Sequence, residues 1–227
     1  MGEVLSEVQA EIKKCKHEIE RLQAINEIQN LMSTFQYLHT AHKHKDVMAL
    51  YAKKQKDVRI NFANQGYWEG FDAPQRAWAF LDRMTDNPPP GMMAIHPITT
   101  PVIVVAGDGK TAKGVWIGTG ISASSMGRRD EGRGPNAAWA WQKYGVDFIK
   151  EDGKWKFWHF HIYRIFRLDW DAARWEDQFK KDEPTMIVEI QPDGPSVDDF
   201  PYLPTTTQVL APIPPTPYET WEQTFSY

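Results

Sequence analysis

The sequence has 227 residues, a formal net charge of −4 and a single cysteine. This length suits one domain with appended segments. One cysteine excludes a disulfide framework and a cysteine-rich metal site, and the acidic balance argues against nucleic-acid binding. No apolar run reaches the roughly 18 residues of a transmembrane helix. We therefore expect a cytoplasmic protein without nucleic-acid or membrane partners, and one unusually rich in aromatic side chains, with 10 Trp, 8 Tyr and 11 Phe.

Apolar residues recur every three or four positions through residues 3–45, which predicts helix almost throughout. Residues 1–24 are highly charged and carry only a narrow apolar seam. They are expected to form a helical extension that either frays in solvent or makes a short coiled-coil-like contact. Cys15 is interpreted as a surface or seam residue rather than a nucleophile. Further helices are predicted at residues 46–54 and 73–83.

β-branched and aromatic residues predict strands at residues 58–62, 98–106, 111–121, 137–150 and 154–166. Residues 66–70 predict a turn or hairpin, and the polar, glycine-rich residues 122–136 a loop. Helices followed by hairpin-linked strands predict an α+β domain over residues 25–170, with an antiparallel sheet packed on the N-terminal helices. Residues 171–227 are rich in proline and aromatics. We expect an extended arm on this domain or on a neighbouring subunit, the alternative being disorder.

The candidate acid–base groups are four histidines and one aspartate: His42, His96, Asp147, His159 and His161. His159 and His161 alternate along the last predicted strand and are expected to continue the face of Trp155 and Phe157, where a core grades into a polar pocket. Each histidine could instead be a hydrogen-bonded core residue. The pair could also bind a metal ion with His96 or Asp147, but the aromatic surroundings argue against it. No metal and no cofactor is predicted.

Three motifs carry a resemblance to a known family. Tyr37, His42 and Asp46 end the first helical stretch, His96 opens a strand that ends at Gly107-Asp108-Gly109, and an aromatic strand from Tyr144 is followed by Asp152-Gly153 and Trp155. Together they resemble the NTF2-like superfamily, in particular its SnoaL-like branch. The resemblance implies a cone, in which a curved sheet and helices enclose a deep apolar pocket. It places Tyr37 and His96 at the family's pocket positions, and His42 where a catalytic aspartate usually stands.

Enzymes of this branch are similar in using pocket Tyr, Asp and His side chains for acid–base catalysis without a cofactor. We therefore expect a cofactor-independent lyase that removes water, or formaldehyde by retro-aldol cleavage, from a bulky aromatic alcohol of phenolic, lignin- or lignan-like type. The alternatives are a non-catalytic small-molecule-binding domain and a hydroxysteroid dehydratase or isomerase.

The predicted substrate contacts combine aromatic walls with polar donors: Arg59, Asn61, Trp68, Trp116, Trp139, Trp141, Lys143 and Tyr144. The other face of the last predicted strand is apolar at its centre, around Phe160. A face of that kind predicts a homodimer or higher homo-oligomer, unless the aromatic tail covers it.

Overall fold

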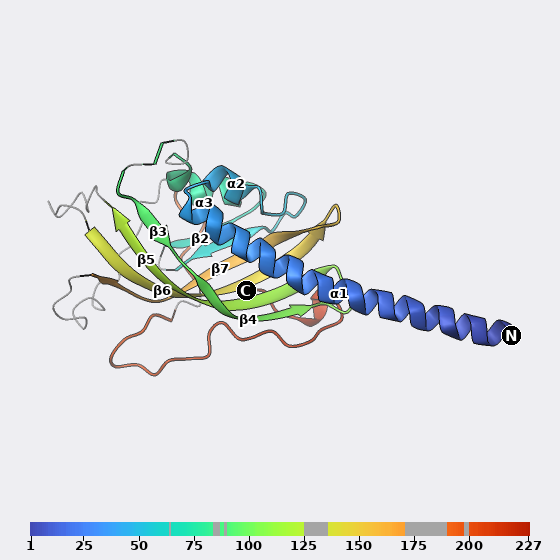
Figure 1. Ribbon diagram of the computed structural model, residues 1–227. Coiled ribbons are helices and arrows are strands. Elements are labelled where there is room, and N and C mark those ends of the chain that lie inside the picture. Colours follow the sequence, from blue (N-terminus) through green and yellow to red (C-terminus); the bar gives the residue numbers. More distant parts are fainter. Residues whose placement is uncertain (64, 84–86, 89, 125–135, 171–189, 198–199) are drawn as a thin grey trace.

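The computed structural model describes residues 1–63, 65–83, 87–88, 90–124, 136–170, 190–197 and 200–227 (Figure 1). Helices lie on one face of a seven-stranded sheet, and the C-terminal segment runs across the other face. We call the face under the helices the inner face and the opposite face the outer face. No helix of this described part is long and apolar enough to span a membrane.

The helices are α1 (Gly2–Thr40), α2 (His44–Met48) and α3 (Ala73–Asp82). The predicted continuous helix over 3–45 is interrupted between α1 and α2, where His42 adopts a φ of 57°. Histidine is among the side chains that tolerate this left-handed conformation best. The buried residues of α1 begin at Ala24, and the N-terminal part of the helix projects beyond the body (Figure 1).

The strands are β1 (Arg59–Phe62), β2 (Gly66–Glu69), β3 (Met93–Ile95), β4 (Ile98–Val105), β5 (Thr111–Ser124), β6 (Asn136–Glu151) and β7 (Lys154–Asp169). They follow the order β2-β1-β7-β6-β5-β3, with β4 also paired to β5. The expected antiparallel sheet is a mixed one, because β1 pairs with β7 in parallel. The predicted loop at 122–136 starts later, since β5 continues to Ser124; residues 125–135 lie outside the described part.

A β-bulge in β7 changes which side chains reach each face. The pairing of β6 with β7 shifts beside Asp147, so that Trp158 is an extra residue in β7. Because strand side chains alternate with a period of two, one extra residue sends the following side chains to the opposite face. His159 and His161 therefore point to the outer face, whereas Phe157 lies on the inner face. The prediction that these histidines share a face with Phe157 is wrong for this reason.

The inner face holds a core in which aromatic rings from α1, α3 and the sheet meet. Phe35 of α1 lies 4.9 Å from Phe160 and 5.8 Å from Phe157, measured between ring centroids. Both strand residues are buried, so the apolar centre predicted for the outer face belongs to the inner one. The outer face is covered by described parts of the arm, with Tyr218 and Tyr227 buried against the chain's own sheet.

Candidate functional site

Four histidines gather at the C-terminal end of α1, beside the inner face: His39, His42, His44 and His96. His39 Nδ1 lies 3.1 Å from His44 Nε2. The ring centroid of His39 is 5.5 Å from that of His96, and those of His42 and His44 are 6.1 Å apart. We call this group the histidine cluster.

Four different local structures bring these rings together. His39 follows Phe35 by one helical turn and stacks on it, with centroids 5.9 Å apart. His42 lies in the left-handed turn and His44 begins α2. His96 precedes β4 and packs over Gly120 of β5, where a Cβ would lie 2.0 Å from His96 Nδ1. The absence of a side chain at Gly120 therefore provides the space that this imidazole occupies.

Aromatic and amide side chains form the walls around the cluster. The ring of Trp78 lies 5.7 Å from His44 and 5.8 Å from His39. On the sheet, the buried Tyr144 hydroxyl accepts a hydrogen bond from Gln142. Burial raises the pKa of Tyr144 to about 12, against the opposing effect of the neighbouring Gln36 and Gln142 amides. This phenol stays protonated at neutral pH and can donate its hydrogen.

Burial keeps the whole cluster uncharged at neutral pH. It lowers the pKa of His96 to about 4, with help from the Arg167 charge, and that of His44 to about 4, with help from His42. Burial also lowers the pKa of His42, and burial with repulsion from the other three imidazoles lowers that of His39 well below its usual value. Neutral imidazoles accept protons, so the cluster consists of potential bases.

Two of these imidazoles keep ring nitrogens without partners. Both ring nitrogens of His42, and Nδ1 of His96, are buried and form no hydrogen bond in the described structure. A buried polar atom left unsatisfied costs about 1–3 kcal/mol. Such atoms at the wall of an apolar core are available to a ligand that enters beside them.

Asp147 and His159, predicted as catalytic residues, lie on the outer face. Asp147 forms a fully buried ion pair with Lys113, and its Oδ2 lies 2.9 Å from His159 Nδ1. The arm completes this group, because the Ser226 hydroxyl donates to Asp147 Oδ2 at 3.1 Å and the Tyr227 backbone N–H donates to it at 2.9 Å. We call Lys113, Asp147 and His159 the outer polar row.

His161, Asn61 and Arg59 also lie on the outer face. Asn61 Nδ2 is 2.7 Å from His161 Nε2 and donates to the Val197 carbonyl of the arm at 3.1 Å. Burial, and then the Arg59 charge, lower the pKa of His161 to about 3. Arg59 itself donates from Nε to Glu69 at 2.7 Å. These side chains hold the arm and the β1–β2 hairpin together.

The remaining predicted residues are divided among three places. Tyr37 does not line a pocket, because its side chain is 80% exposed on α1. Trp68 and Trp116 are buried in the inner core, where their indole N–H groups donate to the Ile190 carbonyl and to Gln29. Trp139 and Trp141 are more than one-third exposed and stack on Trp170 and Phe166 outside the histidine cluster.

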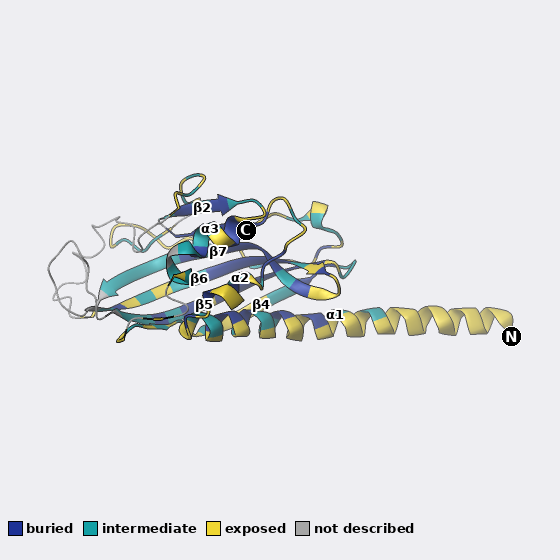
Figure 2. Cartoon of the chain, turned by 90° about the horizontal axis from the view of Figure 1, so that it is seen from above, coloured by how far each residue is buried: buried dark blue, intermediate teal, exposed yellow. Residues whose placement is uncertain are grey.

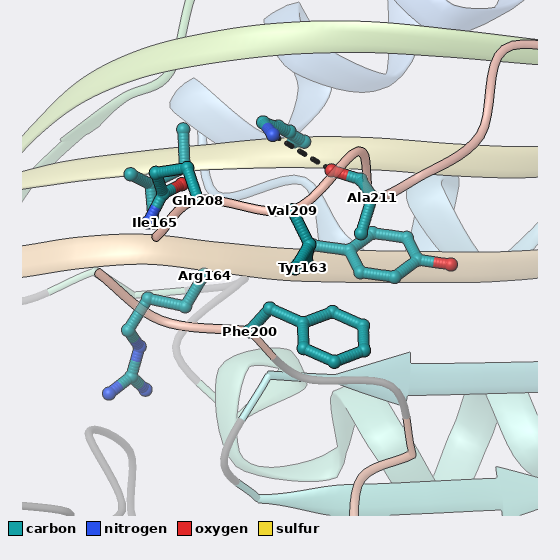
Figure 3. A pocket seen from close by; sticks show the side chains of 8 residues that line it. Tyr163, Arg164, Ile165, Phe200, Gln208, Val209 and Ala211 are labelled. Carbon is teal, nitrogen blue, oxygen red and sulfur yellow. Dashed lines mark hydrogen bonds between the residues drawn. The ribbon is translucent and has the colours of Figure 1, made fainter. Parts of the chain in front are cut away.

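Lys143 lines a small, shallow hollow between the outer face and the arm (Figure 3). Its ammonium group donates to the Ala211 carbonyl at 2.8 Å. Tyr163 and Phe200 form other parts of the wall. The predicted set therefore separates: His42, His96, Trp68, Trp116 and Tyr144 lie on the inner side, whereas most of the others lie on the outer side.

Sequence reasoning omitted His39 and His44 from the site. The signal for His39 was present, because Met32, Phe35 and His39 follow one another at three- and four-residue spacing and so share a helical face. His44 had no comparable signal, since its place depends on the turn at His42. Within the described residues, no group of three or more His, Cys, Asp or Glu side chains is arranged to hold a metal ion.

Comparison with known proteins identifies one family by its sequence model and several solved structures of similar fold. Residues 20–161 match the family described as SnoaL-like domain. A crystal structure provisionally named a scytalone dehydratase, from Novosphingobium aromaticivorans, shares 16% identity and superposes with a TM-score of 0.52, covering 69% of this chain and 93% of that one. Hexachlorocyclohexane dehydrochlorinase LinA-type3 from Novosphingobium barchaimii shares 14% identity, with a TM-score of 0.51 and coverage of 69% and 97%. No curated protein sequence matches the chain.

Proposed function

Because the chain belongs to the SnoaL-like family of NTF2-like proteins, we propose that it is a cofactor-independent lyase whose site is the histidine cluster. The observation that carries this proposal is the burial of His42 and His96 with free ring nitrogens on the inner side of the sheet. The cluster lies between helices and sheet, where the resemblance of the sequence to this family predicts the pocket. The dehydratase and dehydrochlorinase names of similar structures are compatible with it, although the likeness shows the fold alone.

The chemistry follows from the protonation states. A neutral imidazole, His42 or His96, accepts a proton from a substrate C–H or O–H group. Because burial lowers the pKa of these imidazoles, the imidazolium that forms is a strong acid and readily returns its proton. The proton goes to the departing hydroxyl, which leaves as water. The electron pair released by the first step forms the new double bond, so that no cofactor has to accept electrons.

Tyr144 is proposed to stabilise negative charge on a substrate oxygen. Its hydroxyl is protonated and accepts a hydrogen bond from the Gln142 amide on the inner face. A hydrogen-bond donor positioned in a dry site stabilises a developing oxyanion more than water does. In a retro-aldol cleavage, the same base would take the O–H proton of a hydroxymethyl group, and the C–C bond would break to release formaldehyde. The electron pair of that bond would remain on the substrate carbon, and the imidazolium would return the proton to that carbon. We propose a bulky aromatic alcohol as substrate, since Phe35 and Trp78 provide flat apolar surfaces beside the imidazoles.

The test is mass spectrometry of products after incubation with a panel of phenolic diols and hydroxysteroids. His42→Gln and His96→Gln remove the basic nitrogen while keeping a polar side chain, and both are expected to lower turnover at least 100-fold. The matched control is His17→Gln, where α1 contacts the Gly107 carbonyl at a distance from the histidine cluster, and this variant should keep full turnover. Normal turnover in both cluster variants would contradict the site. Ligands that quench tryptophan fluorescence but remain chemically unchanged would indicate a binding domain instead.

A further inference from the structure

We propose that residues 5–22 of α1 form a parallel, in-register coiled coil with a second copy of this chain. The residues concerned alternate at three- and four-residue spacing and form what we call the N-terminal seam: Leu5, Val8, Ile12, Cys15, Ile19 and Leu22. Its five aliphatic side chains are 49–66% exposed, and Cys15 is exposed as well. Aliphatic side chains repeated at this spacing on a helix surface are typical of a coiled-coil interface.

The chain's own domain cannot cover this seam. His17 lies 2.6 Å from the Gly107 carbonyl and Arg21 donates to the Val105 carbonyl at 3.0 Å, so this side of α1 faces the domain. Ile19 is two positions from each, which is about 200° around the helix axis. The seam therefore points away from the body, and Figure 2 shows the projecting part of α1 almost wholly exposed.

The seam residues favour a two-stranded parallel pair. With Leu5 at heptad position a, Ile12 and Ile19 also occupy a, and position d holds Val8, Cys15 and Leu22. Isoleucine at a and leucine at d favour two parallel strands. The seam ends at Leu22, because the next a and d positions hold the polar Asn26 and Gln29.

The charged residues that flank the seam also favour a parallel pair. Glu11 and Glu18 occupy position g, and Lys16 occupies position e. In a parallel, in-register pair, Glu11 of each copy faces Lys16 of the other, because a g residue meets the e residue of the next heptad. In an antiparallel pair, g residues face one another, so glutamates would meet glutamates. The charges of two copies are therefore complementary in the parallel pair and repel one another in the antiparallel pair.

The structure also removes two obstacles to association. Helices of this length are marginal when isolated, because the first turn is costly to form. Here α1 is continuous with a segment whose Ile28 and Met32 are fully buried in the core, so the helix is already formed before any partner arrives. Since each domain lies on the side of α1 opposite its seam, the two domains would occupy the two outer sides of the pair without overlapping.

Cys15 provides a direct test, because it is the single cysteine of the chain and occupies position d. In a parallel pair it faces its own copy, within the span of a disulfide. Oxidised glutathione added to the full-length protein accepts the two electrons and two protons that a pair of Cys15 thiols gives up. We expect a disulfide-linked dimer on a non-reducing gel, and a dimer mass by light scattering before oxidation.

A cysteine at a second position of the seam tests whether the two helices are parallel. In Leu5→Cys/Cys15→Ser, position 5 faces its own copy only if the helices are parallel, because in an antiparallel pair it lies opposite Leu22. This variant should also cross-link. Cross-linking of the wild type without cross-linking of this variant would overturn the parallel register.

The interface itself is tested with matched charge changes. Ile12→Glu/Ile19→Glu should lower the yield of the Cys15-linked dimer at least tenfold, because this variant places charges in the seam. Ser6→Glu/Ala10→Glu adds the same charge at exposed positions outside the seam and should cross-link as the wild type does. A monomeric wild type, or cross-linking unaffected by Ile12→Glu/Ile19→Glu, would overturn the proposal.

Discussion

Both faces of the sheet bury histidines, but the two faces differ in whether the ring nitrogens have hydrogen-bond partners. On the outer face, His159 has a carboxylate and a hydroxyl as neighbours, and Asp147 receives hydrogen bonds from both neighbouring elements and the arm. On the inner face, His42 and His96 keep ring nitrogens that contact no polar partner. A satisfied polar group stabilises a fold, whereas an unsatisfied one is retained at a cost. This difference supports a structural role for the outer-face groups and the proposed catalytic role for the histidine cluster.

The largest effect on stability is expected from the outer polar row. Asp147→Ala leaves the Lys113 ammonium buried without its carboxylate, and the loss of one partner from a buried pair costs about 3–5 kcal/mol. Urea unfolding monitored by tryptophan fluorescence measures this change. The double variant Lys113→Met/Asp147→Leu removes both charges and should recover most of the lost free energy. A double variant as unstable as Asp147→Ala would show that the charges themselves are not the cause.

Replacing one histidine on each face with leucine should have opposite effects on stability and on turnover. His159→Leu withdraws a partner from Asp147 and should lower the free energy of unfolding by about 2 kcal/mol, with turnover of the folded protein retained. His96→Leu removes a buried ring nitrogen that has no partner among the described residues and should leave stability within about 0.5 kcal/mol or raise it, while abolishing turnover. Urea unfolding and product analysis on both variants give the comparison. Loss of stability from both, with turnover intact in both, would make the histidine cluster structural.

Stability should also depend on pH through the cluster. In the unfolded chain, His96 takes up a proton with a pKa near 6.5, whereas the folded protein keeps it neutral down to about pH 4. The unfolded state therefore binds more protons between these values, so the free energy of unfolding falls as the pH falls through this window. One histidine contributes at most about 1.4 kcal/mol per pH unit.

The measurement is urea unfolding at a series of pH values for wild type and His96→Gln. The free energy of unfolding of the wild type relative to His96→Gln should be constant well above pH 6.5 and should fall as the pH falls towards 4, because only the unfolded wild type gains this proton. Parallel curves throughout the window would mean that His96 titrates normally in the folded protein.

The fold could be predicted from the sequence, whereas the sides of the sheet on which several candidate site residues lie could not, and the reasons are local. Helix α3 and strands β4 to β7 followed from periodicity and turn residues, which are short-range signals. The bulge at Trp158 has no such signal, and it reversed the expected faces of His159 and His161. Tyr37 failed for a simpler reason: it lies two positions from Phe35, and residues two apart do not share a helical face. Nothing local reveals that His39 meets His96, because their contact depends on how α1 crosses the sheet.

The smallest expected effect concerns the arm. The Tyr227 hydroxyl donates to the Ile213 carbonyl at 2.6 Å, joining two parts of the arm over the outer polar row. Tyr227→Phe keeps the ring beside Lys113, with which it makes a cation–π contact of 4.3 Å, and removes only this hydrogen bond. The free energy of unfolding should fall by about 1 kcal/mol.

Tyr37→Phe is the matched control for this variant, because its hydroxyl belongs to an exposed side chain; neither its stability nor its turnover should change. A Tyr227→Phe protein as stable as this control would mean that the hydroxyl adds nothing to the closure of the arm. A loss of turnover in Tyr37→Phe would return that tyrosine to the site, and the separation of the two faces into architecture and chemistry would then have to include the solvent side of α1.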